Sequence, residues 1–245
     1  MLAFENEEIE PYWFETATPT FLTRKVKAEG INAAHLNGVS RSRESLITVG
    51  IGSDDIIPLM FQTGYLTIVS YDRRKKRYEL GFPNREVEIG FARNLLPLYS
   101  PASKDPDSLF GIFSFQDDLF YGRPDDFMRR LGTLLKTIPY GMHGENIYQS
   151  IAYLICTLSS MDTRPEQHSY KGRSDMEVFT PDFIYIFEFK FNRSVEEALA
   201  QIHERDYAGR HALDHRQVYL IGANFSDKKE QQGLEGYVIE KVEAG

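Results

Sequence analysis

Residues 172–190 read GRSDMEVFTPDFIYIFEFK and predict two short strands on either side of a Thr-Pro-Asp turn. The second strand is rich in aromatic and β-branched residues, which are typical of strands. Because Pro181 cannot adopt the positive φ of a two-residue hairpin turn, we expect a longer loop. A four-residue loop over 180–183 pairs residue 180 with residue 183 and places Asp175 opposite Glu188. An odd-length loop would shift this pairing.

Polar side chains end the second of these strands. Side chains alternate between the two faces of a strand, so Glu188 and Lys190 point the same way. The aromatic residues of the strand point the other way and are expected to pack under a helix: Phe183, Tyr185, Phe187 and Phe189. Opposed side chains have Cβ atoms roughly 4.5–5.5 Å apart, so the carboxylates of Asp175 and Glu188 repel each other unless a positive charge lies between them.

A magnesium or manganese ion would offset this repulsion, since hard cations take oxygen ligands and often use one or two carboxylates plus water. Lys190 could then orient an attacking water or stabilise charge on a phosphate. The alternative is an exposed strand end with Asp175 as a solvated partner. Asp182 lies in the turn, some five to six rises of about 3.3 Å from Glu188, and is interpreted as a turn residue.

The segments around this hairpin predict an α/β (α+β) domain with a mixed sheet flanked by helices. GENIYQSIAYLICTLSSM carries apolar residues at helical spacing, and SVEEALAQIHERDYAGRHAL opens with a capping box from Ser194 to Glu197. RQVYLIGANF predicts a short buried strand and GYVIEKVE another. His203, His211 and His215 show no ligand spacing and are expected at the surface rather than on zinc.

The first half of the chain predicts a mostly helical, winged-helix-like domain. A helix is expected to start at Thr18-Pro19. A short helix ending near Gly64, a strand over 65–71, a charged turn, a strand over 77–82 and a helix after Pro83-Asn84 follow. SPASKDPDS, residues 100–108, is the best linker, so we expect domains over 1–104 and 105–245.

The charged turn Arg73-Arg74-Lys75-Lys76-Arg77 has two interpretations. It is a solvated hairpin tip, which is the commoner role of a charged loop, or it touches nucleic-acid phosphates through charge alone.

The composition of the chain excludes some classes of function. A net charge of −8 argues against a protein that coats nucleic acid without specificity, although it leaves room for an acidic nuclease. The single cysteine, Cys156, lies in an apolar run and is expected to be a buried thiol. No apolar run reaches the length of a membrane span, and the acidic start lacks the pattern of a signal peptide. We therefore expect a cytoplasmic protein that does not bind membranes.

GRSDMEVFTPDFIYIFEFK followed by SVEEALAQIHERDYA resembles the PD-(D/E)xK nuclease superfamily, in particular the branch of bacterial proteins that join an AAA-ATPase-like region to this domain. The resemblance covers about residues 138–225 and implies a restriction-endonuclease-like fold. It also implies roles for single residues. These are Asp175 and Glu188 as metal ligands, Lys190 as the catalytic lysine, Glu145 as the acid that completes the metal site, and Gln201 and Tyr207 as supporting polar residues. Ser174, rather than proline, precedes Asp175.

The first half resembles the end of the ATPase-like region, in YWFETATPTFL and QTGYLTIVSYD. The phosphate-binding loop of ATPases is absent, so we expect no ATP hydrolysis. The chain is expected to be either a fragment, whose missing ATPase portion would be a partner, or a natural form without that function.

The resemblance implies Mg²⁺- or Mn²⁺-dependent phosphodiester hydrolysis on nucleic acid, with DNA expected and RNA left open. The alternative is a non-catalytic nuclease-fold module for binding or regulation within an ATPase-containing protein.

Overall fold

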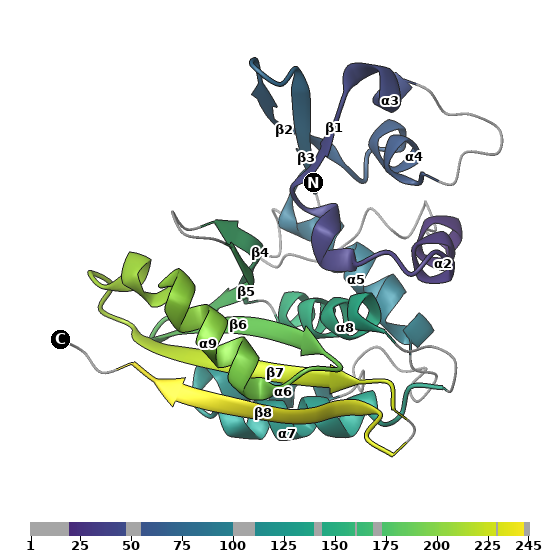
Figure 1. Ribbon diagram of the computed structural model, residues 1–245. Helices are drawn as coiled ribbons and strands as arrows, with labels where there is room; N and C mark the ends of the chain where they lie inside the picture. Colours follow the sequence, from purple (N-terminus) through teal and green to yellow (C-terminus); the bar gives the residue numbers. More distant parts are fainter. Residues whose placement is uncertain are drawn as a thin grey trace, which may run out of the picture. The chain divides into compact units, whose positions relative to one another are not determined.

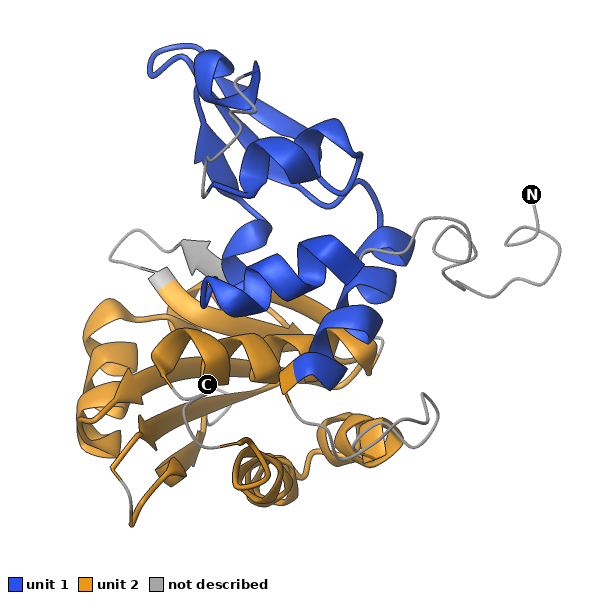
Figure 2. Cartoon of the chain, turned by 90° about the vertical axis from the view of Figure 1, so that its right-hand side faces the viewer, with its two compact units in different colours: residues 1–98 blue, residues 99–245 orange. Residues whose placement is uncertain are grey.

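The computed structural model describes residues 20–47, 55–99, 111–139, 144–159, 161–168, 173–228 and 230–242. The chain forms two compact units, residues 1–98 and 99–245, shown in two colours in Figure 2. The expected linker at 100–108 lies outside the described residues, so the expected domain boundary stays a prediction. No helix in the described ranges is both long enough and apolar enough to span a membrane.

Unit 1 is built around a small antiparallel sheet with strand order β1-β3-β2. Its elements in chain order are α2 (Thr20–Ala28), η2 (Ala33–Leu36), β1 (Val39–Arg41), α3 (Arg43–Ile47), α4 (Ile57–Gln62), β2 (Thr67–Asp72), β3 (Arg77–Gly81) and α5 (Arg85–Tyr99). The predicted helix, hairpin and helix are confirmed as α4, β2–β3 and α5. The expected cap at Thr18-Pro19 lies outside the described residues, and β1 was not expected from the sequence.

Unit 2 contains the larger sheet, with strand order β4-β5-β6-β7-β8. Its elements are α6 (Ile112–Phe120), α7 (Pro124–Leu135), α8 (Glu145–Leu158), β4 (Asp162–His168), β5 (Arg173–Phe179), β6 (Phe183–Phe191), α9 (Val195–Arg205), η4 (Ala208–His211), β7 (Gln217–Ser226) and β8 (Gly233–Lys241). Among the described strands, β6 and β7 are the one parallel pair, because α9 carries the chain back to the start of the next strand. The predicted mixed sheet flanked by helices is confirmed.

The predicted register of the β5–β6 hairpin is also confirmed. Met176 pairs with Phe187, and Phe179 pairs with Ile184. The amide of Thr180 donates a 2.9 Å hydrogen bond to the carbonyl of Phe183, and the hydroxyl of Thr180 accepts one of 3.0 Å from the Phe183 amide. The loop over 180–183 therefore closes with its own hydrogen bonds and needs no positive φ at Pro181.

Strand β6 is buried on both faces. On the aromatic face, the Tyr185 hydroxyl donates to the carbonyl of Leu119 in α6, and the Phe187 ring lies 5.9 Å from that of Phe127 in α7. On the opposite face, Ile184 and Ile186 belong to an apolar cluster that α9 and the turn after it cover, with Phe179, Ile202, Tyr207, Val218 and Leu220. Figure 1 shows α9 on one side of the sheet and α6 and α7 on the other. Burial of each large apolar side chain stabilises the fold by roughly 1.5–3 kcal/mol.

Candidate active site

The polar end of β6 lies under α9. Ser194 accepts a 3.2 Å hydrogen bond from the amide of Glu197, which confirms Ser194 as the N-cap of the predicted capping box and fixes the start of the helix. The apolar face of α9 then packs on the sheet through Ile202, which orients Gln201, one residue earlier, toward the end of β6. The capped start of α9 thus determines which polar side chain reaches the strand.

Three of the predicted site residues form a closed set of hydrogen bonds. The ammonium of Lys190 donates to Oε1 of Glu188 at 2.8 Å and to Oε1 of Gln201 at 2.7 Å. The side-chain amide of Gln201 donates to the same oxygen of Glu188. Each side chain is therefore oriented by the other two, and Lys190 is only 13% exposed.

Asp175 joins this group from the neighbouring strand. Its Oδ2 accepts a 2.8 Å hydrogen bond from the backbone amide of Phe189, the residue between Glu188 and Lys190. This bond ties the start of β5 to the polar end of β6, one step beyond the last paired residues, Met176 and Phe187. The carboxylates of Asp175 and Glu188 are close enough that the charge of Asp175 acts on Glu188.

Glu188 is the electrostatic centre of the site. Its side chain is almost fully buried, and burial raises its pKa from 4.5 to about 7, with the charge of Asp175 as the second cause. Lys190 and Arg205 act in the opposite direction. The second carboxylate oxygen, Oε2, is buried and has no hydrogen-bond partner among the described residues. A buried carboxylate oxygen without a donor is costly in its charged form, and a cation beside it would offset that cost.

These features fit a hard divalent cation. The donors are carboxylate oxygens, which suit Mg²⁺ and Mn²⁺. Within the described ranges no group of three His, Cys, Asp or Glu side chains is placed to hold a metal ion. Glu145, at the first position of α8, accepts a 3.3 Å hydrogen bond from Gln149. The structure therefore brings Asp175 and Glu188 together without forming a three-ligand group with Glu145, whose role as third ligand stays a prediction.

Tyr207 lies at the edge of this group. It is buried, and its hydroxyl lies 3.5 Å from the side-chain nitrogen of Gln201, at the limit of a hydrogen bond. Burial raises the pKa of Tyr207, and the charges of Glu188 and Asp175 raise it further. Its phenol is therefore neutral and lies within electrostatic range of both acids.

Asp182 takes no part in these contacts. Its backbone carbonyl accepts a 2.9 Å hydrogen bond from the amide of Gln217, and it lies in the loop between β5 and β6. The Pro-Asp pair of the loop is thus separate from the acids that meet at the other end of the hairpin.

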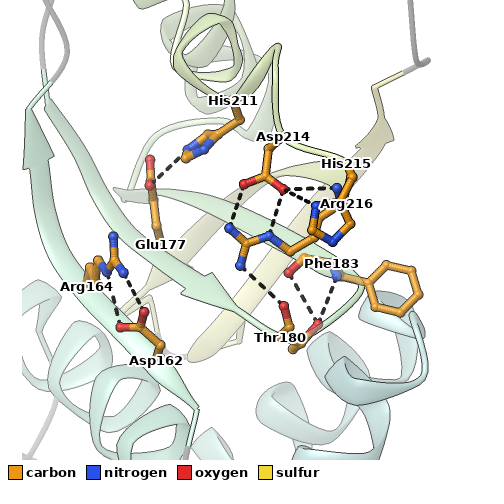
Figure 3. A network of polar contacts seen from close by, with 9 residues as sticks. All are labelled: Asp162, Arg164, Glu177, Thr180, Phe183, His211, Asp214, His215 and Arg216. Carbon is orange, nitrogen blue, oxygen red and sulfur yellow. Dashed lines mark hydrogen bonds and ion pairs between the residues drawn. The ribbon is translucent and has the colours of Figure 1, made fainter.

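A second polar network on β5 was not expected from the sequence (Figure 3). Glu177, only 1% exposed, accepts hydrogen bonds from Ser174 at 3.2 Å and from His211 at 3.2 Å, and it forms an ion pair with Arg210. Its position in a strand of buried neighbours was the available signal, because a buried carboxylate requires buried donors. Which donors these would be could not be read from the strand.

Cations surround His211, which corrects the expectation that it lies at the surface. Its side chain is 11% exposed, whereas that of His215 is 86% exposed. Burial, followed by the charge of Arg210, lowers the pKa of His211 from 6.5 to about 4. Arg216 pairs with Asp214 at 2.6 Å and lies over the ring of Phe179. Arg164, in β4, lies over the same ring. The network fixes η4, which directly follows Tyr207.

Comparison with known proteins finds a family match over the part of the chain that contains these residues. The model of the PD-(D/E)XK nuclease superfamily matches residues 143–234. An uncharacterised protein in the vnfD 5′ region of Azotobacter chroococcum mcd 1 is 30% identical over 254 aligned residues, which cover 99% of this chain and 48% of the relative. The chain thus spans about half the length of that relative. No solved structure matches. The matched range includes α8, the β5–β6 hairpin, α9 and β7. Residues 143–234 are therefore a domain of the PD-(D/E)XK nuclease superfamily.

Proposed function

We propose that this chain hydrolyses phosphodiester bonds of nucleic acid, with DNA as the substrate, at the site formed by Asp175, Glu188, Lys190 and Gln201. The observation that carries the proposal is the state of Glu188. This carboxylate is buried next to a second one, is held by Lys190 and Gln201 on one oxygen, and has no partner in the described structure on the other. A carboxylate placed in this way is expected at a functional site, because its burial costs free energy and groups with strongly shifted pKa values cluster at such sites.

Asp175 and Glu188 are the residues that would hold a Mg²⁺ or Mn²⁺ ion, with Glu145 as a further candidate. The bound ion would supply charge stabilisation and an activated water for hydrolysis. Asp175 keeps one oxygen on the Phe189 amide, which fixes the direction of the carboxylate.

Lys190 and Gln201 have distinct roles in the proposal. Lys190 carries the positive charge that would stabilise the phosphate as negative charge develops on it. Gln201 donates to Glu188 and accepts from Lys190, so it keeps the acid and the base in one fixed geometry. It acts through these two side chains and is a positioning residue.

A second candidate is a non-catalytic nuclease-fold module that binds or regulates. The observation in its favour is that the ammonium of Lys190 is already engaged by Glu188 and Gln201, while the whole chain carries a net charge of −8. The relation to AAA-ATPase-like proteins is likewise a proposal. In that case the missing part of a longer protein would supply the ATPase, since this sequence contains no phosphate-binding loop.

The test is cleavage of supercoiled plasmid DNA by the full chain with Mg²⁺, Mn²⁺, Ca²⁺ or EDTA, beside a titration of Mn²⁺ binding by calorimetry. We expect Mg²⁺ or Mn²⁺ to support cleavage and EDTA to abolish it. Glu188→Gln should lose both metal binding and cleavage, whereas Glu204→Gln, an exposed acid on α9, should retain both. Metal binding without cleavage of DNA or RNA by the wild type would favour the non-catalytic module.

A further inference from the structure

The hairpin of unit 1 exposes a run of five cationic residues. Asp72, the last residue of β2, is followed by Arg73, Arg74, Lys75, Lys76 and Arg77, the first residue of β3. Every one of these side chains is exposed. The chain as a whole carries a net charge of −8, so this basic tip, residues 73–77, has the opposite sign to the rest of the molecule.

The acid at the base of the turn shapes the tip. Oδ1 of Asp72 accepts hydrogen bonds from the backbone amides of Arg74 at 2.9 Å and Lys75 at 3.0 Å. These bonds lower the pKa of Asp72. Its other oxygen lies 4.0 Å from the ammonium of Lys75. The carboxylate therefore stabilises the turn itself and engages only one of the five cations.

The strands below the tip form a stable support. Tyr71 and Tyr78 pair across the hairpin, with ring centroids 4.7 Å apart and an angle of 31° between the rings. Such cross-strand aromatic pairs stabilise a hairpin. The aromatic pair and the turn bonds of Asp72 stabilise the backbone of the turn, which reduces the backbone entropy lost when the tip binds a ligand.

Three of the cations have no acidic partner. In the described part of the chain, no carboxylate lies within ion-pair distance of Arg73, Arg74 or Arg77. Lys76 is different, because its charge acts on Glu44. Three guanidinium groups within five residues, each without an ion-pair partner among the described residues, are suited to phosphate groups, which the planar guanidinium binds with two parallel hydrogen bonds.

We propose that the basic tip binds the sugar–phosphate backbone of nucleic acid and so adds a substrate-binding surface outside the nuclease domain. The choice of nucleic acid rather than an acidic protein rests on the proposed function. The contact is electrostatic and independent of base sequence, because phosphate contacts carry no sequence information. It therefore contributes affinity, while the site in unit 2 contributes the chemistry.

The test measures binding without cleavage. Full-length protein carrying Glu188→Gln, in EDTA, is titrated into a labelled duplex of about 30 base pairs and into one of its single strands, over a range of KCl concentrations. One variant adds Arg73→Gln, Arg74→Gln and Arg77→Gln. A control variant removes the same charge from exposed positions elsewhere, through Arg24→Gln, Arg43→Gln and Lys136→Gln. Thermal melting checks that both variants fold.

We expect the tip variant to bind more weakly and its plot of log K against log [KCl] to be less steep by about one to three units. The loss should be equal on two unrelated duplex sequences, and the control should keep the parent slope. Comparison of duplex and single strand then identifies which form the tip prefers.

An unchanged slope, or an equal change in the control, would overturn the proposal and leave an acidic protein or solvent as the neighbour of the tip. Absence of any binding by the parent at low salt would overturn it as well. Because cleavage is not measured, a failed plasmid assay would count against the proposed hydrolysis and leave this result standing.

Discussion

The backbone amide of Phe189 donates a hydrogen bond of 2.8 Å to the carboxylate of Asp175, fourteen positions earlier in the chain. This bond links the two strands of the hairpin just beyond their last backbone pair. Its donor, Phe189, lies between Glu188 and Lys190, which carry the polar side chains of β6. It places the charge of Asp175 beside Glu188 and contributes to the raised pKa of that carboxyl group. A loop closed by local contacts thus determines which acids meet at the far end.

The first prediction separates Asp175 from Asp182. Asp175→Asn should reduce metal-dependent cleavage about 10- to 100-fold, because it replaces a charged oxygen ligand of the proposed ion with a neutral one while one oxygen still accepts from Phe189. Asp182→Asn should leave cleavage unchanged, since asparagine suits the same turn. Plasmid assays on both variants decide the matter. The reverse outcome would mean that the metal site lies at the turn.

Lys190 provides the second prediction. Lys190→Met keeps the apolar stem and removes the charge, so we expect turnover to fall about 10²–10³-fold while Mn²⁺ binding remains. Calorimetry and single-turnover cleavage measure the two effects separately. Lys228→Met, at an exposed position, is the control. Loss of metal binding in Lys190→Met would show that the lysine acts by holding Glu188 rather than on the phosphate.

Gln201 should behave as a positioning residue. Gln201→Ala removes the acceptor of Lys190 and a donor to Glu188, and such supporting contacts are typically worth about 10- to 100-fold in activity or metal affinity. Gln201→Glu places a third acid beside Glu188 and should bind Mn²⁺ with altered affinity. The matched control on the same helix is Glu204→Ala. Full activity of Gln201→Ala would exclude the positioning role.

The ion pair between buried Glu177 and partly exposed Arg210 should be important for stability. Arg210→Met leaves Glu177, at 1% exposure, without its charged partner, and we expect a loss of about 3 kcal/mol in the free energy of unfolding. Arg129→Met breaks two ion pairs on the exposed surface of α7 and should cost much less, because exposed ion pairs contribute little to stability. Urea unfolding of both variants measures the difference. Equal losses would show that Ser174 and His211 satisfy Glu177 without Arg210.

His211 should make the protein less stable in mild acid. Its folded pKa, about 4, is lower than the ordinary 6.5. The unfolded chain therefore takes up a proton that the folded protein does not. Neutral His211 therefore adds to the free energy of unfolding. This contribution is complete above pH 6.5 and is lost as the pH falls toward 4. The groups that act on it are Glu177, Arg164, Arg210, Asp214 and Arg216.

His211→Gln tests this pH dependence, because glutamine keeps a nitrogen donor for Glu177 and does not titrate. The variant should lose less stability than the wild type between about pH 7 and pH 5, as measured by urea unfolding. Identical slopes in the two proteins would mean that the pKa of His211 is the same in the folded and unfolded states.

Much of the candidate site could be predicted from local sequence. The Thr-Pro-Asp loop excludes a tight turn, and strand alternation then places Glu188 and Lys190 on one face. Ser194 and Glu197 mark the start of α9 because the cap is a contact between residues three apart. Turn, alternation and cap are short-range properties, so the hairpin register and the polar end of β6 follow from the residues themselves.

Burial and the choice of partners depended on the tertiary structure. The family resemblance implied a supporting role for Gln201. The residues near Glu188 do not by themselves indicate that α9 covers that face of β6, or that one oxygen of Glu188 is left without a donor among the described residues. The strand β4 was likewise not predicted. Neither were the partners of Glu177, since Arg210 and His211 follow Glu177 by more than thirty residues. The sequence alone determined which side chains share a strand face. The packing of distant segments decided which of them lose water and therefore which charges interact strongly, because the strength of a charge depends on its surroundings.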